Sequence, residues 1–425
     1  MQRRSAIGKR VLCVSVLAAA LVAGAAAGAA AEKVTVMMLG SLSKGLGEAV
    51  DAFSAQTGIQ VEFVEFATWF ELMEKLPTMV AGGIAPDVVY HDNSSQADLY
   101  HKGIVQPVEE YVKRDGFDLS RWPEPLLEGY RYGGVLYSLP TGISNWVTFY
   151  NVDKMRAAGL PGVPADWDAD GFTFSDLLDM ARKLTRDQDG DGTPEQYGIS
   201  GFFSSGMQGL HLWGLDWIDD DQTEFVGTTA AHIEAIGEMR QLWEFGAAGG
   251  NWLSGTAVML ITQPYYLNTI ATAMDQGGLF TWAIGVLPRA ACRCNPASFH
   301  SLGMVAGSAN PEGAWAFIKF MTTDPAAAVV FSRAENRTPV VPASILDFND
   351  RWERKNPGMN AHVFTSGFEQ IVSPNWFGLP RAVFDRIVAG LTQVMRGQQD
   401  PRVAMEEIKP VVDGMLQEMR RSQAR

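Results

Sequence analysis

The stretch that decides the fold is Leu136–Gly159, which reads LYSLPTGISNWVTFYNVDKMRAAG. Its first part is rich in β-branched and aromatic residues and predicts extended chain, interrupted by Pro140 and Gly142. After Tyr150 the pattern changes to a short helix that ends at Gly159. We interpret this as a strand that leaves one lobe, bends at Thr141–Trp146 and opens a second lobe. A binding site would then lie in the crevice between the lobes.

The same stretch resembles a known family. Pro140, the run Tyr150–Asp153 and Gly159-Leu160 resemble the crossing segment of family 1 extracellular solute-binding proteins, which serve ATP-binding-cassette (ABC) importers for sugars. A second match runs from Pro86–Val89 to Gly103–Val108. The resemblance implies a type II-like, maltose-binding-protein-like α/β fold. In that fold two lobes, each a mostly parallel sheet flanked by helices, are joined by a multi-strand hinge.

The order of elements in the first lobe supports this fold. Strand-like and helix-like patterns alternate from Lys33 to Tyr90, which is typical of a parallel sheet covered by helices. The resemblance places a returning strand at Trp282–Pro288 and a third crossing at Asn336–Pro339. We therefore expect an N-terminal lobe of residues 32–145 with 284–335 and a C-terminal lobe of residues 146–283 with 336–425.

The N-terminus has the pattern of a secretory signal. Four basic residues precede the apolar run Val11–Val22, and small residues follow up to Ala31, where we expect cleavage. Removing residues 1–31 takes the formal charge from −14 to about −18. Such an acidic chain argues against nucleic acid and anionic membranes as partners. We expect a soluble monomer in the periplasm, with membrane permease subunits as its partners.

Aromatic residues carry the functional prediction. The sequence has 12 tryptophans, several of them in loops where strands are expected to end. An indole covers the apolar face of a sugar ring, while polar side chains bind its hydroxyl groups. Trp146 is the expected central platform, and Tyr265 and Gln263 enter through the family resemblance. The full set of expected ligand-binding residues is Ser43, Trp69, Asp92, Asn93, Asn145, Trp146, Trp213, Gln263, Tyr265, Ser301 and Arg337.

An acidic loop resembles the first half of an EF-hand calcium loop. Asp187, Asp189 and Asp191 alternate, and Gly192 follows at the sixth position. The twelfth position is Gly198 instead of Glu, so the bidentate ligand would have to come from Glu195 or from a distant residue. The loop therefore predicts either a structural calcium site or an acidic turn without metal. No other cofactor is expected.

Two cysteines, Cys292 and Cys294, remain after removal of the leader. They offer too few ligands for zinc, and no histidine stands at a matching spacing. Export favours oxidation, whereas a bridge across a single residue is geometrically demanding. The sequence leaves both a disulfide and two free thiols open.

Two rival functions stay open beside the binding of a neutral sugar, oligosaccharide or polyol. One is a binding protein for an anionic solute, such as a sugar acid or a glycerophosphodiester, which would use Lys44 and Arg337. The other is an exported polysaccharide-active enzyme. The sequence has no nucleophile elbow, zinc-protease motif, Walker loop or dinucleotide fingerprint, so we expect no enzymatic activity.

Overall fold

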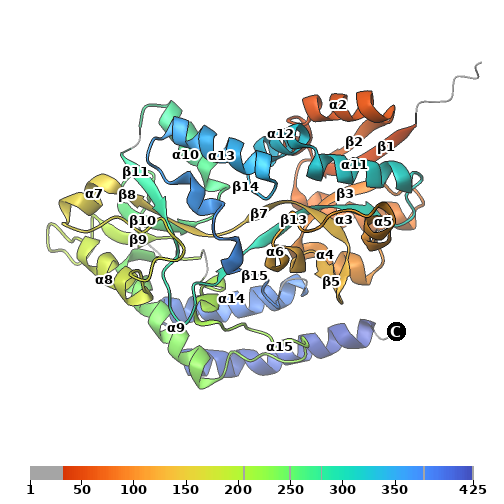
Figure 1. The fold of residues 1–425 in the computed structure, drawn as a ribbon. Helices are drawn as coiled ribbons and strands as arrows, with labels where there is room; N and C mark the ends of the chain where they lie inside the picture. The colour runs from red at the N-terminus through yellow and green to blue at the C-terminus, as the bar shows by residue number, and fades with distance from the viewer. Residues whose placement is uncertain (1–31, 204–205, 248–249, 279, 377–378, 424–425) are drawn as a thin grey trace, which may run out of the picture.

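The computed structural model describes residues 32–203, 206–247, 250–278, 280–376 and 379–423, and the expected leader lies outside them. The described chain forms two α/β lobes, each with its own sheet and buried core (Figure 1). The predicted two-lobe fold is confirmed. Among the described residues, no helix combines the length and apolar composition needed to cross a membrane.

The N-terminal lobe is a mixed sheet whose two faces are covered by helices. Alternate residues of β1 enter different cores, because Val36 and Met38 pack on one face and Met37 on the other. The strand order is β14-β7-β13-β3-β1-β2, with β4 paired to β13. The strands are β1 Lys33–Leu39, β2 Gln60–Phe66, β3 Val88–Asp92, β4 Val105–Gln106, β7 Ser138–Ser144, β13 Ser298–Val305 and β14 Thr338–Pro339, beside a small hairpin of β5 Arg131–Tyr132 and β6 Val135–Leu136. The helices are α1 Gly40–Ser43, α2 Gly47–Thr57, α3 Trp69–Ala81, α4 Asn93–His101, α5 Glu109–Asp115, α6 Glu124–Glu128, α11 Pro311–Thr323 and α12 Pro325–Glu335.

The C-terminal lobe is built on a four-stranded sheet in the order β11-β8-β10-β9. Its strands are β8 Val147–Asn151, β9 Tyr197–Ser200, β10 Ala257–Thr262 and β11 Trp282–Gly285. Its helices are α7 Val152–Ala157, α8 Phe174–Leu184, η1 Gln208–Trp213, α9 Ala230–Leu242, η2 Trp243–Ala247, α10 Tyr266–Asp275, α13 Pro342–Lys355, η3 Ala361–Phe364, α14 Arg381–Met395 and α15 Pro401–Gln423. Short pieces near the hinge are β12 Asn295–Pro296, η4 Phe368–Gln370 and β15 Ile371–Val372.

The expectation of mostly parallel sheets is only partly right. β1 pairs in parallel with β2 and β3, as the alternating pattern predicts, but β13 is antiparallel to β3 and β7. In the second sheet β8 is antiparallel to both neighbours. The physical reason is the crossing itself. A strand that enters a lobe from the hinge runs opposite to the strands whose ends point at the hinge.

The crossing at the deciding stretch is shorter than its bend of Thr141–Trp146 suggests. β7 belongs to the first sheet and β8 to the second, and only Asn145 and Trp146 separate them. The second passage comes after 284, because Trp282–Gly285 pairs with β8 and Val286 and Leu287 lie in the C-terminal core. The third passage between the lobes follows β14, because β14 still pairs with β7 of the first sheet.

Asn145 holds the crossing together. Its side chain is fully buried, its amide nitrogen donates to Phe364 O at 2.9 Å, and its oxygen accepts from the Thr338 hydroxyl at 2.6 Å. Trp146 is held similarly, because Asn295 Oδ1 accepts from its N–H and Asn295 Nδ2 donates to its carbonyl, both at 2.9 Å. Two side-chain amides thus replace sheet bonds where the chain leaves one sheet and enters the other.

We predict that Asn145→Ala lowers the free energy of unfolding by about 1–3 kcal/mol, because it leaves a buried carbonyl and hydroxyl without partners. Urea unfolding measures the change. Asn268→Ala, at an exposed position on α10, should change stability by no more than about 0.5 kcal/mol. Equal effects of the two variants would show that the amide does not hold the crossing.

Candidate functional site

A cleft of about 1210 Å³ lies between the lobes, where the sequence predicts a crevice. Helices α3 and α4 and strand β5 form one wall, and α14 with the end of α15 forms the other. In Figure 1, α15 runs along the lower side of the molecule from the C-terminal lobe to beneath the N-terminal lobe. The cleft is lined by Trp69, Phe70, Met73, Ser94, Ser95, Asp98, Leu99, His101, Lys102, Tyr132, Gln208, Gln222, Trp376, Leu379, Pro380, Arg381, Ala382, Val383, Phe384, Met415, Glu418 and Met419.

The start of α3 provides the aromatic surface of the N-terminal wall. The Thr68 hydroxyl accepts from the N–H of Glu71 at 3.2 Å and caps the helix, so that Trp69 is its first residue. The ring of Trp69 stands nearly perpendicular to Tyr90, with centroids 6.1 Å apart. The cap and the buried Tyr90 together fix the indole at the edge of the cleft.

The opposite wall carries a second indole. Trp376 packs against Phe384 with ring centroids 5.4 Å apart. Met415 and Met419 stand four residues apart on α15, so they share the face that lines the cleft. The cleft therefore has an aromatic surface on each lobe.

The cations of the cleft already have anionic partners. Lys102 Nζ lies 2.7 Å from Asp98 on the same wall, and Arg381 Nε lies 2.7 Å from Asp385. Exposed pairs of this kind contribute little stability, but each cancels most of the local charge. The lining consequently presents no uncompensated pair of cations to a ligand.

Comparison with known proteins agrees with this architecture. The family model for bacterial extracellular solute-binding proteins matches residues 40–328, more than half of the chain. The chain belongs to this family. The sugar-binding protein MalE of Xanthomonas citri has a similar fold, with a TM-score of 0.76 at 18% sequence identity, covering 91% of this chain and 98% of that one.

Two further solved structures are similar. An ABC substrate-binding protein of Listeria monocytogenes in complex with cycloalternan gives a TM-score of 0.72 at 21% identity. UgpB of Mycobacterium tuberculosis in complex with glycerophosphocholine gives a TM-score of 0.73 at 20% sequence identity. Each comparison covers 91% of this chain and 99% of the other. At these identities the comparisons establish the two-lobe fold of this solute-binding protein.

A buried polar network lies at the hinge beside the Trp69 wall. The carboxylate Oε1 of Glu335 accepts from the Tyr90 hydroxyl at 2.8 Å and from the Thr141 hydroxyl at 3.0 Å. Tyr90 Oη is also 3.0 Å from His300 Nδ1, and His300 Nε2 is 3.1 Å from the Ser144 hydroxyl. The network links three strands of the first sheet to the end of α12, and so holds together the elements that cross.

Local backbone features make room for this network. The β7–β13 register shifts at Thr141, which bulges out of the ladder between the partners of His300 and Ser301. A Cβ atom on Gly142 would lie only 2.7 Å from Glu335 Oε2, so glycine is needed at this close approach. Together the bulge and the glycine let α12 place a carboxylate against a strand.

Burial controls the titration of these groups. It raises the pKa of the Glu335 carboxyl to about 7, although the hydrogen bond from Tyr90 and the charge of Arg337 favour the ionised form. Burial and the nearby Arg337 hold the pKa of His300 well below its usual value, so this imidazole is neutral. Glu335 is thus the group of the network that titrates near neutral pH.

Among the residues expected at the site, Trp69 lines the cleft. Asp92 caps α4 by accepting from the N–H of Ser94 at 3.0 Å, and burial raises its pKa. Asn93 is buried and bridges to the backbone of Ala297 and Phe299. Trp69 comes after β2, Asp92 is the last residue of β3 and Asn93 is the first residue of α4. In this conformation the hydrogen bonds of Asp92 and Asn93 are made within the protein.

The other expected residues are spread over the hinge and the lobes. Ser43 is buried and donates to Glu65. Ser301 is buried beside His91. Gln263 donates to Ser144 O at 3.0 Å across the crossing, and Arg337 joins the hinge network through its charge. Tyr265 is 44% exposed, and Asn145 is the crossing residue described above.

Two of the predicted platforms pack within the C-terminal lobe. Trp146, the expected central platform, is only 3% exposed and packs on Phe203 with ring centroids 4.9 Å apart. Trp213 packs on Phe174 at the same centroid distance. Neither is among the residues that line the cleft, so in this conformation their indoles contribute to the core.

Trp376, Phe384 and Glu335 lie in positions that sequence reasoning did not select. Trp376 belongs to a region with no strong family motif, and Phe384 resembles an ordinary apolar position of a helix. Glu335 looks like a surface residue at the end of a helix. Only the aromatic character of Trp376 signals a binding role in the sequence.

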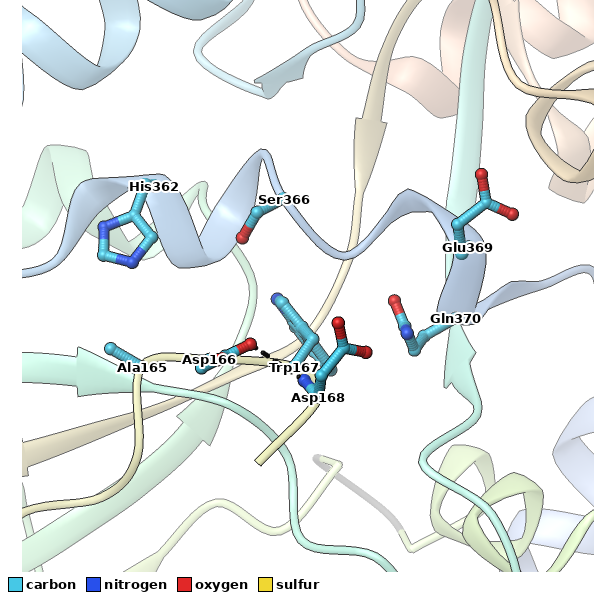
Figure 2. Close-up of a pocket in the computed structure, with 8 residues that line it drawn as sticks. All are labelled: Ala165, Asp166, Trp167, Asp168, His362, Ser366, Glu369 and Gln370. Carbon is cyan, nitrogen blue, oxygen red and sulfur yellow. Dashed lines mark hydrogen bonds between the residues drawn. The ribbon is translucent and has the colours of Figure 1, made fainter. Parts of the chain in front are cut away.

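A second cavity, of about 610 Å³, lies between loop 165–168 and the segment 362–370 (Figure 2). Trp167 is 4% exposed and donates its indole N–H to Val363 O at 2.8 Å, which fastens the loop to η3. Asp166 accepts from the N–H of Asp168 at 2.9 Å, as Figure 2 shows. The two cavities share no lining residue.

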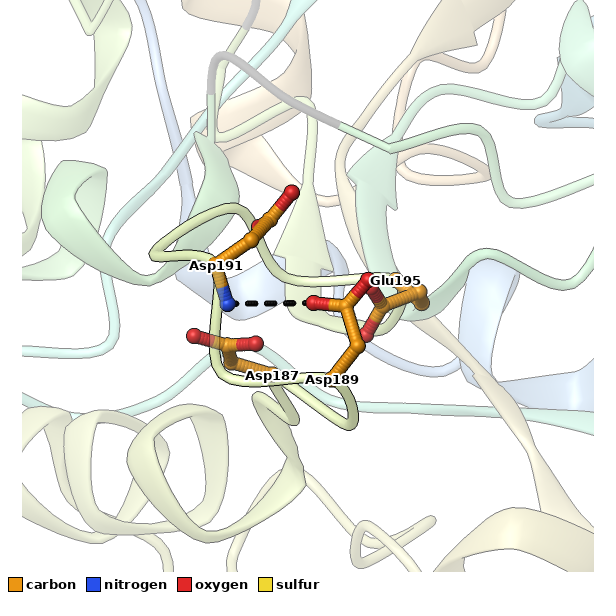
Figure 3. Close-up of side chains that lie close together, drawn as sticks. All are labelled: Asp187, Asp189, Asp191 and Glu195. Carbon is orange, nitrogen blue, oxygen red and sulfur yellow. Dashed lines mark hydrogen bonds between the residues drawn. The ribbon is translucent and has the colours of Figure 1, made fainter.

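The acidic loop brings its four carboxylates together, as Figure 3 shows. One oxygen each from Asp187, Asp189, Asp191 and Glu195 lies within 4.8 Å of the others. Glu195 is turned into the group by accepting from the N–H of Gln188 at 2.7 Å. It thereby places a fourth carboxylate beside those of the three aspartates.

The sequence does not decide whether Cys292 and Cys294 are free thiols or a disulfide. In the structure they form a disulfide, with Cα atoms 5.3 Å apart. Arg293 between them is 5% exposed and donates to the carbonyls of Trp167, Ala169 and Phe172. The disulfide therefore lies where the second passage is tied to the C-terminal lobe.

We predict that Glu335→Gln removes part of the pH dependence of stability. The carboxyl titrates near 4.5 when unfolded and near 7 when folded, so the folded protein binds more protons between these values. The stabilisation that the protonated Glu335 carboxyl gives to the folded state is complete below pH 4.5 and is lost as the pH rises through 7. Relative to the variant, the parent should lose about 2–3 kcal/mol between pH 5 and 8.

Urea unfolding across this pH range measures the difference between parent and variant, in which all other titrations cancel. Glu406→Gln, at an exposed position on α15, should follow the parent at every pH. Parallel curves for the parent and Glu335→Gln would show that this carboxyl titrates as it does in the unfolded chain.

Proposed function

We propose that this protein captures a neutral sugar, oligosaccharide or polyol in the interlobe cleft and delivers it to the permease of an ABC importer. The cleft closes around the ligand by rotation of the lobes about the crossing strands. Hinge closure of this kind is the known behaviour of periplasmic binding proteins.

The observation that carries the proposal is the aromatic lining of both walls, with Trp69 and Phe70 on one and Phe384 and the largely buried Trp376 on the other. Two flat surfaces can cover both apolar faces of a sugar ring when the lobes approach. Polar side chains that line the same cleft can bind the hydroxyl groups of the sugar. They include Ser94, Ser95 and Gln222. The similar substrate-binding protein in complex with cycloalternan supports a carbohydrate ligand.

An anionic ligand is the second candidate, because one similar protein is known in complex with glycerophosphocholine. The pairing of Lys102 with Asp98 and of Arg381 with Asp385 favours the neutral ligand. Salt distinguishes the two candidates. The affinity for a neutral sugar should stay the same between 50 and 500 mM NaCl, whereas screening should weaken the binding of an anion.

We further propose that the protein is exported by its N-terminal signal, acts in the periplasm as a monomer, and releases its ligand chemically unchanged. Membership of an extracellular solute-binding family supports the export. Recovery of the intact sugar after incubation with the protein tests the last point, and size-exclusion chromatography with light scattering tests the monomer.

We predict that Trp69→Ala weakens carbohydrate binding at least about tenfold, because stacking contributes about 1 kcal/mol beyond the area that it buries. A thermal-shift screen over a carbohydrate library finds the ligand, since binding to the folded state raises the melting temperature. Calorimetry then compares the variants. Trp213→Ala, which removes an indole outside the cleft lining, is the matched control and should leave the affinity within about twofold.

We also propose that the loop 187–195 binds Ca²⁺ as a structural ion. Its four exposed carboxylates converge, and hard cations prefer oxygen ligands in such a loop. The loop lies away from the residues that line the cleft, so the ion would stabilise the C-terminal lobe without contacting the ligand.

Addition of 10 mM Ca²⁺ to protein treated with a chelator should raise the melting temperature by about 2 °C or more. Asp189→Asn should remove this shift, while Asp221→Asn, in a separate acidic turn, should keep it. Calcium that leaves the parent's melting temperature unchanged would refute the site.

A further inference from the structure

The walls of the cleft carry more apolar surface than two sugar-stacking indoles provide. Of the 22 lining residues, 12 are apolar, and among them Phe70 is exposed while Met73, Met415 and Met419 are only partly buried. We propose that the ligand is an amphipathic glycoside, in which a sugar is joined to an alkyl, acyl or aryl group. This inference rests on the proposed carbohydrate-binding function and names the class of carbohydrate.

The α3 wall shows where the apolar group would lie. Phe70 is 76% exposed beside Trp69, and Met73 follows one helical turn later on the same side as Trp69. An exposed phenyl ring of this size loses unfavourable contact with water only when something apolar covers it. The first two turns of α3 therefore form an apolar surface that extends beyond the single indole.

The facing wall continues this surface. On α15, Val412 and Leu416 are fully buried in the core, while Met415 and Met419 line the cleft beside them. Methionine is flexible and polarisable, and it suits apolar surfaces that must adapt to irregular or variable partners. An alkyl or aryl group between α3 and α15 would contact these side chains from one side and Phe70 from the other.

Polar side chains also line the cleft. Ser94, Ser95 and Asp98 lie on α4, and Gln208 reaches in from η1. Gln208 Oε1 is shielded from solvent and has no hydrogen-bond partner among the described residues. A buried acceptor of this kind is unfavourable unless a donor such as a hydroxyl group reaches it. The cleft thus offers polar groups for hydroxyls together with its apolar side chains, as a ligand made of a sugar and an apolar group requires.

Paired probes test the inference on the purified exported protein. Methyl and hexyl glycosides of glucose, galactose and maltose are compared by calorimetry, with the hexyl compounds below their micelle threshold. For the sugar that binds, we expect the hexyl glycoside to bind at least tenfold more tightly than the methyl glycoside, because a longer chain leaves water.

Variants show whether the gain arises in the cleft. The double variant Met73→Gln with Met415→Gln should reduce the ratio of hexyl to methyl glycoside affinity to less than threefold. Met274→Gln on α10, outside the cleft lining, is the matched control. It should keep the parent's ratio of hexyl to methyl glycoside affinity. Melting temperatures of all variants confirm that they are folded.

The outcomes separate this inference from the function beneath it. Equal affinities for methyl and hexyl glycosides would overturn the inference and leave carbohydrate binding intact, since the apolar walls would then serve contact between the closed lobes. Equal affinities of hexyl glucoside, hexyl galactoside and 1-hexanol would overturn carbohydrate recognition and keep the apolar site. Failure of every probe and every sugar of the library to bind would overturn both.

Discussion

The structure depends on how the chain crosses between the lobes without leaving backbone polar groups unsatisfied. β7 and β8 belong to different sheets, yet only Asn145 and Trp146 separate them. A sheet ladder cannot continue through such a turn, and buried N–H and C=O groups need partners. The amides of Asn145 and Asn295 supply those partners. The lobes can therefore rotate about fixed points while each sheet stays intact, which is what closure around a ligand requires.

The same need for satisfied polar groups shapes the electrostatics near the cleft. The chain is strongly acidic, with a formal charge of −14. The cations of the cleft are nevertheless paired locally, and the buried Glu335 accepts from two hydroxyl groups near the charge of Arg337. The overall charge bears on solubility and on encounter with charged partners. The ligand would experience mainly the local arrangement, which is close to neutral.

Much of the fold could be predicted because it rests on local patterns. The strand, bend and strand of Leu136–Asn151 and the alternating pattern from Lys33 to Tyr90 are both present. The site was harder to predict because it depends on which face a side chain takes. Trp69 and Trp146 both stand near strand ends, but Trp146 turns into the core against Phe203. Sequence spacing does not specify that choice.

Site residues contributed by segments that are distant in the sequence were even harder to predict. Trp376 and Trp69 line the same cleft although more than 300 residues separate them in the sequence. Glu335 meets Tyr90 across 245 positions of the chain. No periodicity connects such segments, and the antiparallel direction of β13 likewise follows from the crossings instead of from its own sequence.

Both indoles of the cleft pack against another aromatic ring, which has a consequence for affinity. Trp69 rests on Tyr90, whose hydroxyl is fixed by Glu335, and Trp376 rests on Phe384. A side chain that is already held in place loses little conformational freedom when a ligand arrives, so more of the contact energy appears as affinity. The support on the N-terminal side comes from the hinge network itself. Residues that let the lobes move thus also keep one binding surface rigid, and a change at the hinge should reach the ligand through the orientation of a single indole.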